Sequence, residues 1–397
     1  MSSDTVEFNL LLPEVHDDPY PLYRRLREHD PVHQSPLGFW VLTRHADVAA
    51  LLRDPRMSSD PRNAVRVREL QASLPDQWRE APSMLFLDPP DHTRLRRLVN
   101  KAFTPAAVER LRPRVEQLVG DALDRAAAAG GMDLVAELAY PLPITIICEL
   151  FAVPPADRQQ FRAWSSALVY LLDPVLATDA LERAVDARQA LRAYVGALVA
   201  ERRARRGPDL LSALVAAEDD GGRLSEQELV SMCLLLLIAG HETTVNLIAN
   251  GALALLRHPD QWARLVASPA LAGGAVEELL RYDSPVQLTS RSALADVEVA
   301  GRHVRQGDEL LLLLGAANRD PEQFPDPDRL DLERQGVRHL AFGGGAHFCL
   351  GAPLARLEAR VALAALATRL PGLRLAGEPR RRDTITLRGL QRLPVAA

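Results

Sequence analysis

Phe342-Gly343-Gly344-Gly345-Ala346-His347-Phe348-Cys349-Leu350-Gly351 is the most informative stretch of this sequence. Its glycines allow a tight turn and a close approach of the backbone to a flat ligand. Cys349 stands just before a helix predicted from Pro353 to about Leu370, and the positive end of a helix favours a thiolate. We therefore expect Cys349 to be a ligand. The alternative is a glycine-rich turn around an inert buried cysteine.

A second polar signal interrupts an apolar helix. The helix is predicted to begin at Ser225, where the sequence through Glu228 forms a capping box, and no proline follows until Pro259. Its middle carries Ala239-Gly240-His241-Glu242-Thr243-Thr244. A glycine and a hydroxyl that bonds back to the preceding turn are expected to open a notch. An acid beside an alcohol can organise a water chain for proton delivery. The alternative is a pair of threonines whose hydroxyls are satisfied by their own helix.

Together these segments resemble the cytochrome P-450 family. The defined positions of its haem-binding loop, Phe-Gly-x-Gly-x-His-x-Cys-x-Gly, are all matched, with Gly344 where relatives often have another small residue. The segment 239–244 looks like the oxygen-activation motif, and Glu278-Leu279-Leu280-Arg281 resembles the Glu-x-x-Arg motif, which on a bare helix would be an ordinary ion pair. The motifs follow the family's order, and the resemblance covers about residues 19–394.

The resemblance implies a heme b (iron protoporphyrin IX) cofactor and roles for individual residues. Cys349 is the expected axial ligand of the iron, and His347, His92, Arg96 and Arg291 are expected at the haem propionates. His92 and Arg96 lie four apart, on one face of a predicted helix. Taken alone, this pair or Arg291 could instead be a surface charge. The catalytic pair is expected to be Thr243, as the alcohol, and Glu242, as the acid where many relatives carry Asp. Glu278 and Arg281 are expected to be structural, and the remaining cofactor-binding positions are Ala239, Gly240, Phe342, Gly343 and Gly351.

The expected fold is mainly α with a small β portion, in a single large haem-enclosing domain over residues 1–397. Strands are expected in a β-rich part at about 31–43, 286–314 and 384–394, and the helical part at about 91–282 and 353–370. Within the first of these ranges, Val32 to Ser35 and Phe39 to Thr43 flank Leu37-Gly38 and predict a β-hairpin. Short helices are predicted near Tyr20 to His29 and from about Ala46 to Leu52, and one helical segment from Pro105 to about Ala129. A last hairpin is predicted from Thr384 to Leu390.

Composition excludes several other classes of protein. The net charge of -5 argues against nucleic-acid binding. Cys148, Cys233 and Cys349 are far apart in the sequence, which does not suggest a disulfide framework. The apolar run Met232 to Gly240 is far shorter than the about 20 residues of a membrane span, and residues 1–12 lack the pattern of a signal peptide. We expect a cytoplasmic monomer with no membrane insertion.

The implied reaction is monooxygenation: one oxygen atom of dioxygen enters a C–H bond by hydroxylation or epoxidation. The electrons are expected from NAD(P)H through a separate ferredoxin and ferredoxin reductase, because the chain contains no flavin or iron–sulfur segment. The docking surface is expected to be a basic patch of Arg97, Lys101, Arg356 and Arg360. Two alternatives remain open: a haem-thiolate enzyme that uses peroxide or no oxidant, and a haem-binding protein without catalysis.

The expected substrate is a bulky hydrophobic small molecule of secondary metabolism, such as a polyketide, macrolide, terpenoid or steroid-like compound. The segments expected to contact it, within 56–86, 164–172, 286–289 and 385–387 and on the long helix, are mostly apolar. The substrate-lining residues named from them are Leu85, Phe86, Leu235, Ile238, Val286, Leu288, Ile385 and Thr386.

Overall fold

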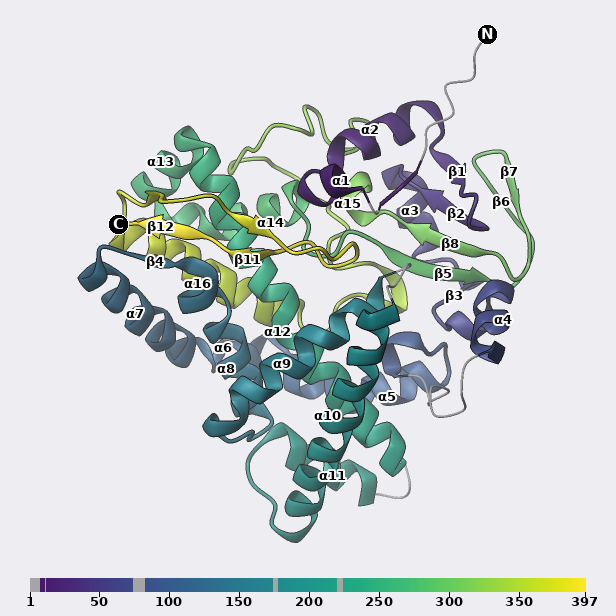
Figure 1. Ribbon diagram of the computed structural model, residues 1–397, viewed down its shortest axis with the longest axis horizontal. Coiled ribbons are helices and arrows are strands. Elements are labelled where there is room, and N and C mark those ends of the chain that lie inside the picture. The colour runs from purple at the N-terminus through teal and green to yellow at the C-terminus, as the bar shows by residue number, and fades with distance from the viewer. Residues whose placement is uncertain (1–7, 11, 74–82, 174–177, 220–223) are drawn as a thin grey trace.

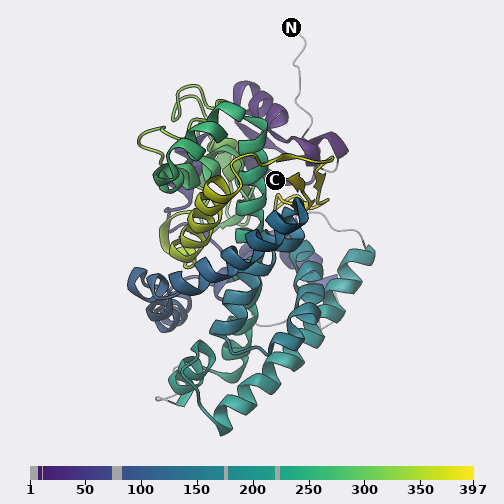
Figure 2. The same cartoon turned by 90° about the vertical axis from the view of Figure 1, so that its left-hand side faces the viewer.

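A computed structural model of the protein describes residues 8–10, 12–73, 83–173, 178–219 and 224–397. The first helices are α1 (Pro13–Asp17), α2 (Tyr20–His29), α3 (His45–Leu51), α4 (Val65–Ser73), α5 (Asp91–Asn100), α6 (Pro105–Glu109), α7 (Arg112–Ala129) and α8 (Pro141–Leu150). The later helices are α9 (Arg158–Leu168), α10 (Thr178–Ala204), α11 (Leu210–Asp219), α12 (Glu226–Arg257), α13 (Pro259–Ala267), α14 (Ala272–Tyr282), α15 (Leu314–Ala317) and α16 (Ala352–Arg369). Figures 1 and 2 both place α10 and α11 at the opposite end of the molecule from α1 and α2.

The strands are short and form small sheets. They are β1 (Val32–Gln34), β2 (Phe39–Leu42), β3 (Met57–Ser58), β4 (Gly131–Asp133), β5 (Thr289–Ala293), β6 (Val297–Val299), β7 (Arg302–Val304), β8 (Glu309–Leu312), β9 (Arg374–Leu375), β10 (Arg380–Arg381), β11 (Leu390–Arg392) and β12 (Pro394–Ala396). The largest sheet has the order β1-β2-β8-β5-β3, and its β2–β8 pair is parallel. The predicted hairpin around Gly38 is confirmed as β1 and β2, with Gly38 at φ 86° in the turn.

Helix α12 runs through the helical part of the molecule and packs against α8, α10, α14 and α16 (Figure 1). The predicted capping box is present: the Ser225 side chain accepts from Glu228 N–H, and Glu228 accepts from Ser225 N–H. Within the described ranges, α12 is the one helix long and apolar enough to cross a bilayer, and 67% of its apolar window is buried inside the protein. That burial is expected of a core helix in a soluble protein.

Several predicted boundaries differ from the structure. The helical segment expected from Pro105 to about Ala129 is divided into α6 and α7, because Pro113 fits only in the first turn of a helix. The hairpin expected from Thr384 to Leu390 has its strands in β10, which precedes that range, and in β11, which begins at its last residue. The predicted residues form mostly the connection between the two strands. Strands β3, β4, β9 and β10 were not predicted, since two or three residues show no clear alternation.

Candidate active site

The cysteine loop folds back on itself before α16. Cys349 N–H donates to Phe342 O at 2.9 Å, and Gly343 and Gly345 have φ values of 68° and 63°, which favour glycine. A Cβ on Gly345 would lie 2.3 Å from Leu52 O, so the close approach at this glycine is to the backbone after α3. The loop thus needs its glycines partly for its own packing and not only for a ligand.

Burial raises the pKa of the Cys349 thiol, whereas the backbone N–H groups at the start of α16 lower it, the direction expected from its place before a helix. The N–H groups of Gly351 and Ala352 and the charge of Arg96 offset only part of the effect of burial. A bound metal cation removes the proton from a coordinating thiol. Cys349 is therefore suited to be a ligand whose thiolate forms with the metal.

The four predicted propionate residues gather near the cysteine loop. The His92 and His347 rings have centroids 4.0 Å apart, and Arg96 Nη1 donates to Ala346 O at 2.8 Å. Burial, followed by the charges of His92, Arg291 and Arg96, lowers the pKa of His347 to about 3. Burial lowers the pKa of Arg291 to about 10.

This cluster fits an anionic group. Within the described part of the chain, none of the four side chains has a hydrogen bond to a carboxylate, and the buried Nδ1 of His92 has no partner. Arg291, only 6% exposed, bonds instead to Thr289 Oγ1 and Ser290 O. Buried and half-buried arginines and imidazoles without a carboxylate are what two haem propionates require.

The middle of α12 has one accessible stripe. Leu235 and Thr243 are half-buried and Ala239 is exposed, at intervals of four residues, whereas His241, Glu242 and Thr244 are buried. Thr243 Oγ1 donates to Ala239 O at 3.2 Å, the predicted bond to the preceding turn. Gly240 also has a packing role, because a Cβ there would lie 2.8 Å from Ile147 Cδ1 on α8.

Glu242 lies in a buried polar cluster. Arg382, in the hairpin between β10 and β11, donates to Glu242 Oε2 at 2.6 Å, and Ser165 Oγ of α9 lies 3.4 Å from Oε1. Burial raises the pKa of Glu242, but His241 and Arg382 outweigh it and hold this pKa at about 2. Sequence reasoning missed Arg382, which is one of three consecutive arginines and has no distinguishing local pattern.

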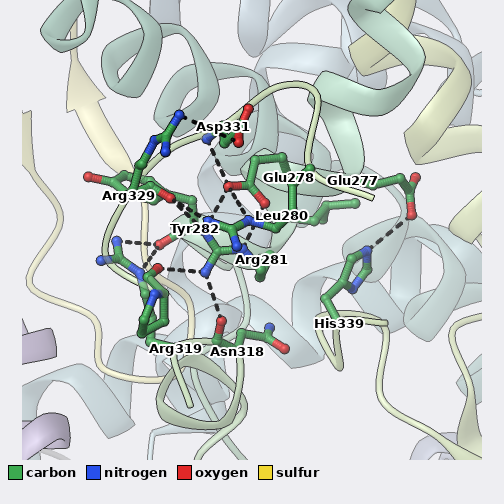
Figure 3. Close-up of polar contacts among 12 residues, drawn as sticks. Glu277, Glu278, Leu280, Arg281, Tyr282, Asn318, Arg319, Arg329, Asp331 and His339 are labelled. Atoms are coloured by element: carbon green, nitrogen blue, oxygen red, sulfur yellow. Dashed lines mark hydrogen bonds and ion pairs between the residues drawn. The ribbon is translucent and has the colours of Figure 1, made fainter. Parts of the chain in front are cut away.

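The Glu278–Arg281 pair is fully buried and also binds residues outside its own helix. Arg281 donates to Glu278 through Nε and Nη2, both at 2.7 Å, and to the carbonyl oxygens of Asn318, Pro327 and Arg329 (Figure 3). Glu278 also accepts from Asp331 N–H at 3.0 Å. The pair fixes the loop after α15 onto α14, which agrees with the structural role expected for it.

The predicted substrate residues do not share one environment. Leu85, Phe86, Leu235, Ile238 and Val286 are at least partly accessible. Leu288 and Ile385 instead belong to a buried core cluster with Tyr20 and Tyr23, because β5 and the C-terminal hairpin pack against the N-terminal helices. Thr386 is buried and donates to Leu172 O. Residues 74–82, part of the predicted contact segment 56–86, lie outside the described residues.

Glu358 on α16 is a buried acid that the sequence analysis did not identify. It is 0% exposed, and among the described residues neither carboxyl oxygen has a hydrogen-bond partner. Burial raises the pKa of Glu358 well above its ordinary value. Its burial could have been predicted from the sequence, because Glu358 comes four residues after Leu354 and so lies on the apolar face of the predicted helix.

Glu358→Gln is expected to stabilise the protein more at about pH 8 than at about pH 4, because burial raises the pKa of Glu358. A carboxyl whose pKa is raised by folding loses stability as pH rises above its unfolded pKa of about 4.3, and glutamine does not ionise. Urea unfolding at about pH 4 and about pH 8 measures this difference. An equal effect of the substitution at both pH values would contradict the assignment of a protonated Glu358.

Comparison with known proteins agrees with this site. The cytochrome P-450 family model matches residues 32–267 and 271–370. The chain is 47% identical over 390 residues to the cytochrome P-450 monooxygenase PikC of Streptomyces venezuelae, covering 95% of this chain and 91% of that protein. It is 44% identical over 402 residues to vitamin D(3) 25-hydroxylase of Pseudonocardia autotrophica, covering 99% and 97% respectively.

A solved structure shows the same fold over nearly the whole chain. The ligand-free crystal structure of CYP164A2 from Mycobacterium smegmatis matches with a TM-score of 0.92 and 47% identity, covering 98% of each chain. The predicted family and the mainly helical fold are thereby confirmed, and with them the haem cofactor that the family uses. The chain belongs to the cytochrome P-450 family of haem-dependent oxidoreductases.

Proposed function

We propose that the protein inserts one oxygen atom of dioxygen into a C–H bond of a bulky hydrophobic small molecule, with Cys349 as the haem ligand. The observation that carries this proposal is the acid–alcohol pair on α12, where Glu242 is buried beside the accessible Thr243. An enzyme that uses peroxide has no need of proton delivery to bound dioxygen, and a haem carrier has no need of the pair at all. The pair therefore favours the monooxygenase over both alternatives.

The side chains of this chain bind the cofactor and deliver protons. Bound haem supplies the reduction and cleavage of dioxygen, which a cysteine ligand favours by donating electron density to iron. Arg96, Arg291, His92 and His347 orient the group through its carboxylates. Thr243 Oγ1 presents a hydroxyl at the accessible stripe of α12, and the ionised Glu242 carboxylate orients the waters that pass protons towards that hydroxyl.

The substrate class is inferred from the accessible apolar residues near this stripe. Leu235 and Ile238 lie on α12, and Phe86 ends the 3₁₀ turn Met84–Phe86. Such residues bind by excluding water from apolar surface, with little need for hydrogen bonds. The relative named vitamin D(3) 25-hydroxylase supports a steroid-like or comparably large secondary metabolite.

The electrons are proposed to come from a ferredoxin and its NAD(P)H-dependent reductase. The ferredoxin would bind to this protein, which we propose to be a monomer in the cytoplasm. Arg97, Lys101 and Arg360 are exposed and remain suitable for an acidic partner. Arg356 is less suitable than expected, because Glu277 binds its guanidinium. The exposed Phe348, beside Cys349, adds an apolar contact to this face.

Turnover under ¹⁸O₂ tests the proposed reaction. The purified protein, with ferredoxin, reductase and NADPH, is expected to convert a member of a macrolide, terpenoid and steroid panel to a product carrying one ¹⁸O atom. Product formation with hydrogen peroxide alone, but not with the reducing system, would support the peroxide-using alternative. Tight ligand binding without product in either condition would support a haem-binding protein without catalysis.

A further inference from the structure

A cluster of three charged or titratable side chains joins α14 and α16 beside the cysteine loop. Glu277 on α14 accepts hydrogen bonds from Arg356 Nε at 2.7 Å and Nη2 at 2.8 Å. His339 Nε2 lies 3.2 Å from Glu277 Oε2 (Figure 3). We call Glu277, His339 and Arg356 the Glu277 cluster. His339 comes shortly before the cysteine loop and Arg356 lies near the start of α16, so the cluster holds both ends of this loop.

Arg356 also acts on the cysteine loop directly. Its guanidinium carbon lies 4.6 Å from the centroid of the Phe342 ring, and Phe342 O accepts the hydrogen bond from Cys349 N–H. Arg356 therefore lies against the residue that holds the backbone of Cys349, and its positive charge stabilises negative charge on the cysteine loop.

Glu277 compensates this positive charge. Burial raises the pKa of Glu277, but the hydrogen bonds from Arg356 and His339 outweigh it and hold this pKa at about 2. Glu277 is therefore ionised at neutral pH. Its side chain is 29% exposed and that of Arg356 38%, so the pair is partly shielded from the solvent that would otherwise screen Arg356.

We propose that Glu277 is a positioning residue that neutralises Arg356 beside Cys349 and so keeps the reduction potential of the bound haem low. The inference rests on the proposed binding of haem by Cys349. Reduction of ferric to ferrous iron adds one electron, and a nearby uncompensated positive charge stabilises the ferrous form. Glu277 cancels this stabilisation by neutralising Arg356, and its two hydrogen bonds keep Arg356 packed on Phe342.

Glu277→Gln in the haem-loaded protein tests the proposal. Glutamine keeps the length of the side chain and an acceptor oxygen for Arg356 but carries no charge. Spectroelectrochemical titration is expected to give a more positive ferric–ferrous potential, with the reduction equilibrium shifted about ten-fold towards the ferrous form by one unit charge. The double variant Glu277→Gln/Arg356→Gln is expected to return most of the way to the wild-type potential, because both charges are gone.

Two further variants keep the test decisive. Arg356→Gln removes the positive charge and leaves the charge of Glu277 uncompensated, so it is expected to shift the reduction potential in the negative direction. This variant tests the proposal independently if Glu277→Gln does not fold. Asp124→Asn is the matched control, because Asp124 pairs with Arg369 at the far end of α16, about 20 Å along the helix from Arg356. This control is expected to leave the potential unchanged.

The inference fails if folded Glu277→Gln has the wild-type potential, or if the double variant keeps the whole shift. Its failure is distinguishable from failure of the proposed function. If the wild-type protein lacks a cysteine-type carbonyl spectrum, the assignment of Cys349 is wrong. If that spectrum is present and the potentials do not respond to charge, only the role of Glu277 is wrong.

Discussion

Glu278→Ala is expected to lower the free energy of unfolding by about 3–5 kcal/mol. The substitution leaves the guanidinium of Arg281, which is 0% exposed, without its carboxylate. Removing one partner of a buried ion pair costs more than the pair itself contributes, since the remaining charge is buried and uncompensated. Arg281 would keep only its carbonyl acceptors on the loop after α15. Urea or thermal unfolding of the haem-loaded protein measures the loss.

Glu333→Ala is the control for this prediction. Glu333 pairs with Arg264, but both side chains are about half exposed, and such a pair contributes about 0–1 kcal/mol. A Glu278→Ala protein that unfolds like the Glu333→Ala protein would show that the buried pair does not hold the fold.

Glu242→Gln is expected to reduce the rate of product formation about 100-fold, the lower end of the usual contribution of a side chain that assists proton transfer. Glutamine retains the shape of the side chain and can still accept a hydrogen bond from Arg382, but it lacks the negative charge that orients the waters. The measurements are the rate of product formation at saturating substrate and the product formed per NADPH consumed. Substrate binding should be unchanged, because Glu242 is 1% exposed and lies beside the accessible stripe, not on it.

Glu228→Gln is the matched control on the same helix. Glu228 is also paired with an arginine, Arg94, but it lies in the first turn of α12. Its replacement is expected to weaken the helix cap without slowing turnover. If Glu242→Gln keeps the wild-type rate and coupling, the proposed proton delivery through Glu242 is wrong.

The sequence predicted those features that depend on neighbouring residues. The capping box at Ser225, the turn at Gly38 and the glycine-dependent cysteine loop are each determined within about ten residues of chain, where local sterics and hydrogen bonds dominate. The bond from Thr243 Oγ1 to Ala239 O was predicted for the same reason. These local patterns were sufficient for the family and the main helices.

Partners from distant segments were not predictable. Arg382 binds Glu242 across 140 positions and Arg356 binds Glu277 across 79, and no local pattern identifies either pair. Leu288 and Ile385 have the apolar character of pocket residues, but the packing of the N-terminal helices buries them in the core.

The most direct test of the account is the absorption spectrum of the purified, dithionite-reduced protein with and without carbon monoxide, for the wild type and for Cys349→Ser. The account predicts a strongly red-shifted Soret band in the carbonyl complex of the wild type and its loss in the variant, because only a thiolate donates enough electron density to iron. A wild-type protein that binds no haem, or that gives the carbonyl spectrum of a histidine-ligated haem, would contradict Cys349 as the ligand.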